Sequence, residues 1–142
     1  MRHWIAGLAA AFLVAGCMSP GDPLGRALAL EDAYKHYTVL VRWGQLEQAS
    51  QFVDPEQRDA YQALAERFGT VRITDFETSD PTFEGKHQAE VEATYRAYSL
   101  STLVEGRFQE RQTWSREPGL GSRWQLRTDL PEALQRLVDG RS

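Results

Sequence analysis

The sequence feature that most constrains the fold is a change of hydrophobic period at Gly69. Before this residue, apolar side chains recur with the three- and four-residue spacing of amphipathic helices, and after it they alternate with polar ones as in strands. The clearest alternation covers residues 88–99, where one face carries Ala89, Val91, Ala93, Tyr95 and Ala97. Helices followed by strands predict an α+β domain whose helices cover one face of an antiparallel sheet.

Three helices are expected before Gly69. The first spans about residues 27–43 and is expected to end at Gly44, and a second, short helix is expected around residues 46–53. Asp54 and Pro55 are a strong start signal for a third helix that runs to Phe68, and Gln57 occupies the capping-box position. The predicted inward side chains are Leu30, Ala33, Tyr34, Tyr37 and Val41 in the first helix, and Ala60, Tyr61, Leu64, Ala65 and Phe68 in the third.

Four strands are expected after Gly69. The first begins at residues 71–74, and its alternation breaks at Asp75, which indicates a bulge. Two longer strands cover residues 88–99 and 104–114, and a short one places Trp124, Leu126 and Thr128 inward before a helical turn or two at residues 131–138. We therefore expect N-terminal helices on a strongly curved four-stranded antiparallel sheet, with a short C-terminal helix.

The chain resembles the nuclear transport factor 2-like superfamily, the cone-shaped α+β fold shared with SnoaL-like proteins and ketosteroid isomerases. The resemblance rests on the helical run 30–68 and on the hairpin RQTWSREPGLGSRWQL, in which Trp114 and Trp124 flank a Gly-rich loop and are expected in the core. It covers roughly residues 27–128. Many members have a short strand between the second and third helices, where this chain offers only residues 50–53. The superfamily includes isomerases, dehydratases, binding proteins and interaction modules, so the resemblance implies a fold and no single activity.

An inward carboxylate is the main candidate for chemistry. Enzymes of this superfamily act on apolar substrates in the mouth of the cone, and strand alternation places Glu110 and Gln112 on the same inward face as Trp114. A carboxylate on an apolar face must be paired, neutralised or solvated. Three interpretations stay open: Glu110 in water or paired with an arginine, a ligand-binding pocket, or proton transfer by Glu110 with a tyrosine donor. The pocket candidates are Tyr37, Asp75, Tyr95, Glu110 and Gln112.

No other motif in the sequence predicts catalysis, a metal or a cofactor. His36 and His87 are isolated, and the chain has no Cys/His cluster, no G-x-S-x-G nucleophile turn and no phosphate-binding loop. The formal net charge of −4 argues against nucleic acid or anionic lipid as a partner, because both need clustered positive charge.

Arginines recur on the outer face of the expected strands. They alternate with glutamates, so this face is either an ordinary solvated surface or a docking face for an envelope protein or a second copy of the chain. The residues concerned are Arg107, Arg111, Arg116, Arg123 and Arg127, with Glu90, Glu92 and Glu105.

The start of the chain resembles a bacterial lipoprotein signal. Arg2 precedes an uncharged apolar run of about 12 residues, too short to span a bilayer but typical of a signal peptide. The run ends in Val14-Ala15-Gly16-Cys17, which resembles a lipobox. The resemblance implies cleavage between Gly16 and Cys17, diacylglycerol on the cysteine thiol and acylation, for example with palmitate, of the new amine. The alternative is an ordinary signal peptide with a stray cysteine.

These features predict residues 1–16 as a signal peptide, residues 17–26 as a lipidated N-terminus with a short tether, and residues 27–142 as a single domain. Met18 replaces the aspartate that retains some lipoproteins in the inner membrane, which favours the outer membrane, facing the periplasm. The expected function is a non-catalytic binding or interaction module without cofactor. The alternative is a small-molecule binder or an isomerase- or dehydratase-like enzyme that uses the cone pocket.

Overall fold

A computed structural model describes residues 23–119 and 122–140. The predicted signal peptide and Cys17 lie outside these residues. The elements in chain order are α1 (Pro23–Arg42), α2 (Leu46–Ala49), the 3₁₀ helix η1 (Ser50–Phe52), α3 (Pro55–Ala63), α4 (Ala65–Phe68), β1 (Val71–Thr78), β2 (Thr82–Glu84), β3 (Gln88–Ser99), β4 (Glu105–Ser115), β5 (Gln125–Thr128) and α5 (Leu130–Val138).

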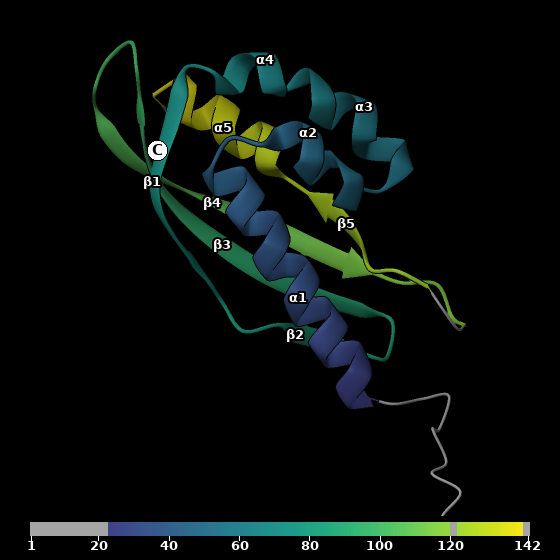
Figure 1. Ribbon diagram of the computed structural model, residues 1–142. Coiled ribbons are helices and arrows are strands. Elements are labelled where there is room, and N and C mark those ends of the chain that lie inside the picture. The colour runs from purple at the N-terminus through teal and green to yellow at the C-terminus, as the bar shows by residue number, and fades with distance from the viewer. Residues whose placement is uncertain (1–22, 120–121, 141–142) are drawn as a thin grey trace, which may run out of the picture.

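The helices lie on one face of an open antiparallel sheet whose two long strands, β3 and β4, twist beneath them (Figure 1). The strand order is β1-β3-β4-β5, and β2 also pairs with β3. The predicted α+β fold, with N-terminal helices and a short C-terminal helix, is confirmed. The strand that the sequence did not predict is β2, because its three residues are all exposed and too few to show an alternation.

The first helix begins at Pro23, inside the predicted tether of residues 17–26, and ends as predicted. Gly44 has a φ of +70°, a left-handed conformation that glycine adopts without steric cost. Its N–H donates to the carbonyl of Val41 over 3.0 Å, and the N–H of Gln45 donates to the carbonyl of Leu40 over 2.9 Å. These bonds satisfy carbonyls that the helix end would otherwise leave unpaired.

The predicted third helix is two helices. It is interrupted at Leu64, between α3 and α4, where the sequence has neither proline nor glycine to mark a break. Tyr61, Leu64 and Phe68 are buried as predicted. The predicted inward positions of Ala60 and Ala65 are wrong, because both are exposed.

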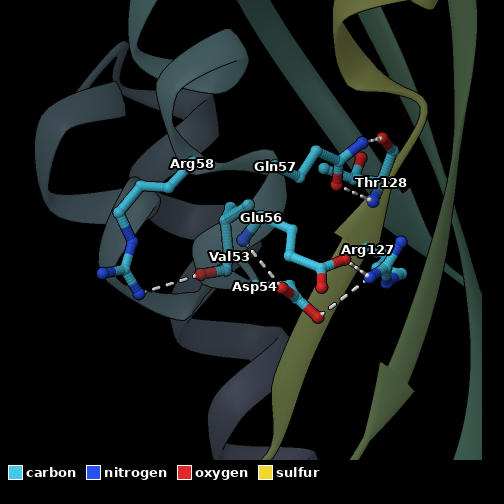
Figure 2. Close-up of polar contacts among 7 residues, drawn as sticks. All are labelled: Val53, Asp54, Glu56, Gln57, Arg58, Arg127 and Thr128. Carbon is cyan, nitrogen blue, oxygen red and sulfur yellow. Dashed lines mark hydrogen bonds and ion pairs between the residues drawn. The ribbon is translucent and has the colours of Figure 1, made fainter.

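The start of α3 covers the edge of β5 (Figure 2). Val53 forms a parallel bridge with Leu126, and the N–H of Asp54 donates to the Leu126 carbonyl over 2.8 Å. The Gln57 side chain bonds both backbone groups of Thr128, donating to its carbonyl over 2.8 Å and accepting from its N–H over 3.1 Å. The expected capping-box role of Gln57 is therefore wrong, and residues 50–53 contribute only the single bridge at Val53 to the sheet.

Charged side chains also connect the start of α3 with β5 (Figure 2). Asp54 caps α3 as predicted by accepting from the N–H of Glu56 over 2.9 Å. Arg127 of β5 pairs with Glu56 over 2.7 Å and with Asp54 over 3.3 Å. Because Arg127 and Glu56 are exposed, the ion pairs position the helix and add little to stability.

The two tryptophans of the hairpin lie in the core as predicted. Trp114 is fully buried, with its ring centroid 6.0 Å from that of Tyr37 in α1 and 6.2 Å from that of Phe52. Trp124 is also buried, and its indole N–H donates to the carbonyl of Arg26 in α1 over 3.3 Å. The hairpin is thereby fixed to the first helix.

Candidate functional site

Strand alternation places Glu110 under the helices. In β4 the residues from Phe108 to Trp114 alternate buried with exposed or half-buried side chains, and Glu110 is one of the buried ones, with 0% of its surface exposed. Its cross-strand partner in β3 is Ala93, whose short side chain leaves room for the carboxyl group. A carboxyl group at such a position needs polar partners from the surrounding elements.

Four donors from three strands and one helix meet this carboxyl group. Oε1 accepts from the Tyr37 hydroxyl over 2.6 Å and from Thr128 Oγ1 over 2.5 Å. Oε2 accepts from the Tyr95 hydroxyl over 2.7 Å and from Gln112 Nε2 over 3.1 Å. Four bonds satisfy the full acceptor capacity of the two oxygens.

A second layer of hydrogen bonds holds these donors. The Tyr61 hydroxyl donates to the Tyr37 hydroxyl over 3.0 Å, and Gln112 also donates to Thr38 Oγ1 over 3.2 Å. Trp114 Nε1 donates to Gln112 Oε1 over 3.1 Å. We call this buried set the Glu110 network; it consists of Tyr37, Thr38, Tyr61, Tyr95, Glu110, Gln112, Trp114 and Thr128, none of them more than 5% exposed.

Burial dominates the proton affinity of the network. It raises the pKa of Glu110 above its ordinary value, while the hydrogen bonds from Thr128, Tyr37, Tyr95 and Gln112 act in the opposite direction. The pKa values of Tyr37 and Tyr95 lie well above the usual range, first because both are buried and then because the Glu110 charge is near. The tyrosines therefore remain protonated and keep donating.

Four of the five predicted pocket candidates come together in this network, namely Tyr37, Tyr95, Glu110 and Gln112. Asp75 does not. It is exposed and lies opposite Arg96 in the register of β1 with β3, because the register shifts between Ile73 and Asp75 and turns its side chain away from the helices. The interpretation of Glu110 as solvated or paired with an arginine is wrong, since it is fully buried among hydroxyl and amide donors.

Sequence reasoning missed the contribution of three residues. Tyr61 and Thr128 were predicted to point inward, but nothing in the sequence indicated that their hydroxyls would reach Tyr37 and Glu110. The helical spacing did not predict Thr38 as an inward residue, because its neighbour Tyr37 already occupies the inward position of that helical turn.

In the part of the chain that the structure describes, the centre of the Glu110 network has no surface that a substrate could reach. Glu110, Gln112 and the three tyrosines that bond to one another or to Glu110 have no exposed surface. Two surface depressions lie elsewhere. One is shallow and lies beside Asp75 and Arg96, and the other is an open groove of about 360 Å³ between α4 and α5, lined by residues that include Phe68 and Leu134.

Within residues 23–119 and 122–140, no three His, Cys, Asp or Glu side chains gather in a way that could hold a metal ion. The helices of this part of the chain are also not long and apolar enough to cross a membrane. Comparisons with protein-family models, with curated proteins and with solved structures gave no match.

The raised pKa of Glu110 predicts a pH dependence of stability. The folded protein binds the proton of Glu110 more tightly than the unfolded chain does. The contribution of this group to the unfolding free energy is therefore greatest below the ordinary glutamate pKa and falls as the pH rises from there to the folded-state pKa. Denaturant unfolding at several pH values should show this fall in wild type relative to Glu110→Gln, which cannot titrate. If the unfolding free energy of wild type relative to Glu110→Gln instead rises with pH, the four hydrogen-bond donors lower the pKa of Glu110 by more than burial raises it.

Proposed function

We propose that this protein is a bacterial envelope lipoprotein, anchored through lipid on Cys17, whose α+β domain is a non-catalytic interaction module. The observation that supports this proposal best is the closed Glu110 network. An enzyme or small-molecule binder of the cone type needs access to the polar groups of the cone, whereas here those groups are fully buried and bonded to one another. This arrangement favours a structural role for Glu110 over proton transfer.

The lipobox-like sequence and the apolar run before it support the membrane attachment. Met18 after the cysteine favours the outer membrane, with the domain in the periplasm. The domain itself would then act near the bilayer, on another component of the envelope.

The outer face of the sheet is the surface that we assign to this partner. The helices cover the opposite face of the sheet (Figure 1). The outward positions of β3 and β4 carry charges of both signs, such as Glu92 opposite Arg111, and Arg96 lies 3.5 Å from Glu105. A mixed-charge face of this kind is suited to a polar protein surface and contributes specificity more than affinity.

Native mass spectrometry tests the non-catalytic part of the proposal. We expect the protein, released from its lipid and free of detergent, to carry no small molecule. A bound mass that reappears in independent preparations, and that is lost in a Glu110→Gln variant that remains folded, would favour the pocket alternative and contradict the proposal.

Photocrosslinking in the intact envelope tests the docking face. Benzoylphenylalanine at Gln109, exposed on the outer face, should give a protein adduct, whereas the same group at Gln48, exposed on the helix side, should not. An adduct of twice the chain mass would identify the partner as a second copy. Absence of adducts at Gln109, or equal adducts at both positions, would exclude the outer sheet face as the docking face.

Cys17→Ser is expected to abolish membrane attachment. Without the thiol no thioether to diacylglycerol can form, and a chain held by several acyl groups loses essentially all of its membrane affinity. When cells are fractionated, wild type should be found with the membrane and Cys17→Ser in the soluble or unprocessed fraction. Intact-mass measurement of wild type should show acyl groups on Cys17. Processing and membrane attachment that persist in Cys17→Ser would favour an ordinary signal peptide.

A further inference from the structure

Apolar side chains are exposed at the end of the domain where the chain enters α1. Leu24 and Leu28 are 67% and 53% exposed, and their four-residue spacing places them on one face of the first helical turns. Phe83 of β2 is 44% exposed and pairs with Ala89 of β3, and in Figure 1 β2 lies toward the same end of the sheet as the start of α1. Large apolar side chains gathered at one end of a soluble domain indicate contact with an apolar or amphipathic partner.

Positive charge gathers at the same end. Trp124 donates to the carbonyl of Arg26 in α1, and the Arg116 guanidinium lies 5.7 Å from the centre of the Trp124 ring. The N–H of Arg116 donates to the carbonyl of His87 over 2.9 Å, which brings the β2–β3 turn with the exposed Lys86 to the same place. Arg123, next to Trp124, is exposed.

Three segments meet here, residues 24–28, 84–87 and 116–123, and their acidic side chains are Glu84 and Glu117, both exposed. These segments hold four cations and two carboxylates, although the whole chain has a formal net charge of −4, and the next carboxylates of α1, Glu31 and Asp32, follow one helical turn beyond Leu28. Composition argues against an anionic lipid as partner, but composition carries no information on where the fold places the charges. The fold concentrates the cations next to the exposed leucines.

The chain length outside the described residues sets the distance of this end from the proposed anchor. Residues 18–22 separate Cys17 from the start of α1 at Pro23, so the two residues can be at most about 22 Å apart. The β3–β4 turn lies at the opposite end of the domain (Figure 1), and its Leu103 and Val104 are also exposed, at 73% and 68%. Of these two exposed apolar regions, the tether keeps only the α1 end close to the bilayer.

We propose that the α1 entry surface, formed by Leu24, Leu28, Phe83, Lys86, Arg116 and Arg123, lies in the headgroup layer of a bilayer that contains anionic phospholipid. The leucines and Phe83 enter the boundary between headgroups and acyl chains, and the basic side chains remain at the level of the phosphates. This orientation directs the β3–β4 turn away from the membrane. The inference rests on the proposed lipid anchor.

Photocrosslinking to lipid tests this surface. The full chain, lipidated on Cys17 or coupled through that thiol to a maleimide phospholipid, is bound to vesicles of phosphatidylcholine with or without phosphatidylglycerol. Benzoylphenylalanine replaces Leu28 in one variant and Val104, an even more exposed apolar residue at the far end, in the other. With phosphatidylglycerol, lipid adducts at position 28 should exceed those at position 104 by about tenfold, because only position 28 lies within the interface.

A charge reversal tests the electrostatic part. Lys86→Glu with Arg123→Glu should lower the adducts at position 28 by about tenfold on vesicles with phosphatidylglycerol. The matched pair Arg107→Glu with Arg111→Glu, which changes charge by the same amount on the outer sheet face, should leave them unchanged.

The outcomes separate this surface from the anchor. Equal adducts at positions 28 and 104 would contradict the proposed contact of the α1 entry surface with the bilayer. Equal adducts at position 28 on both kinds of vesicle would contradict its preference for anionic lipid. Absence of acyl groups on Cys17 in cells would overturn the proposed anchor alone, since the chain coupled to maleimide phospholipid still reports which end faces the bilayer.

Discussion

Replacing Glu110 with alanine is expected to lower the unfolding free energy by about 4 kcal/mol. The substitution removes the acceptor of Tyr37, Tyr95, Gln112 and Thr128 in a site without solvent access. Each buried donor left without a partner is destabilising, and the lost side chain also leaves a cavity. Relief from burying the carboxyl group offsets only part of this. Chemical denaturation followed by circular dichroism or tryptophan fluorescence measures the effect.

Two control variants isolate the network. Glu110→Gln keeps the volume and one acceptor oxygen but turns the second acceptor into a donor that faces two of the four donor groups, so about half of the alanine effect is expected. Glu105→Ala removes a carboxylate from the same strand, where it is exposed and 3.5 Å from Arg96, and should change stability by no more than ~0.5 kcal/mol. An alanine variant at position 110 as stable as wild type would mean that the four bonds do not form in solution.

The network also indicates why the sequence places a polar cluster in the core. Its members come from α1, α3, β3, β4 and β5, so a change in the register of any one element would leave several polar groups unpaired at once. A fully satisfied buried network of this kind specifies one arrangement of the core. Within the described residues its central carboxyl group has no exposed surface, and this observation supports our proposal of an interaction module.

The sequence predicted the inward side chains of the site because periodicity determines which way a side chain points. Helical spacing oriented Tyr37 and strand alternation oriented Tyr95, Glu110 and Gln112, all four correctly. Periodicity does not determine what an inward side chain touches. That Glu110 meets tyrosines and not water or arginine depends on how far α1 and α3 extend over β4, and this is a property of the tertiary packing.

The errors in the fold occur where local signals are short or shifted. A bulge moves every later residue of a strand to the other face, so the side of Asp75 could not be known from an alternation that breaks there. The interruption at Leu64 has no proline or glycine to mark it. Gln57 was placed in a capping box because its spacing from Asp54 allows one, but β5 offers it two backbone partners on Thr128.

Replacing Trp114 with alanine is expected to destabilise the domain by about 4 kcal/mol. The indole is fully buried and packs against the rings of Tyr37 and Phe52. Its removal leaves a large cavity at the centre of the domain, and Gln112 Oε1 loses the donor that holds its side chain. Thermal and denaturant unfolding measure the loss.

Trp43→Ala is the matched control for this substitution. Trp43 is 67% exposed just beyond the end of α1, with the Arg42 guanidinium 4.5 Å from its ring centre, and its removal should cost ~0.5 kcal/mol or less. Equal losses at positions 43 and 114 would contradict the buried placement of Trp114.

Combining Trp114→Ala with Glu110→Ala tests whether the core and the Glu110 network act as one unit. Gln112 bonds both residues, so the first substitution already loosens a group that the second would leave unpaired. The double variant should therefore lose about 1 kcal/mol less than the sum of the two single losses. Strict additivity would show that Gln112 does not connect them, and the polar network and the aromatic core would then stabilise the fold independently.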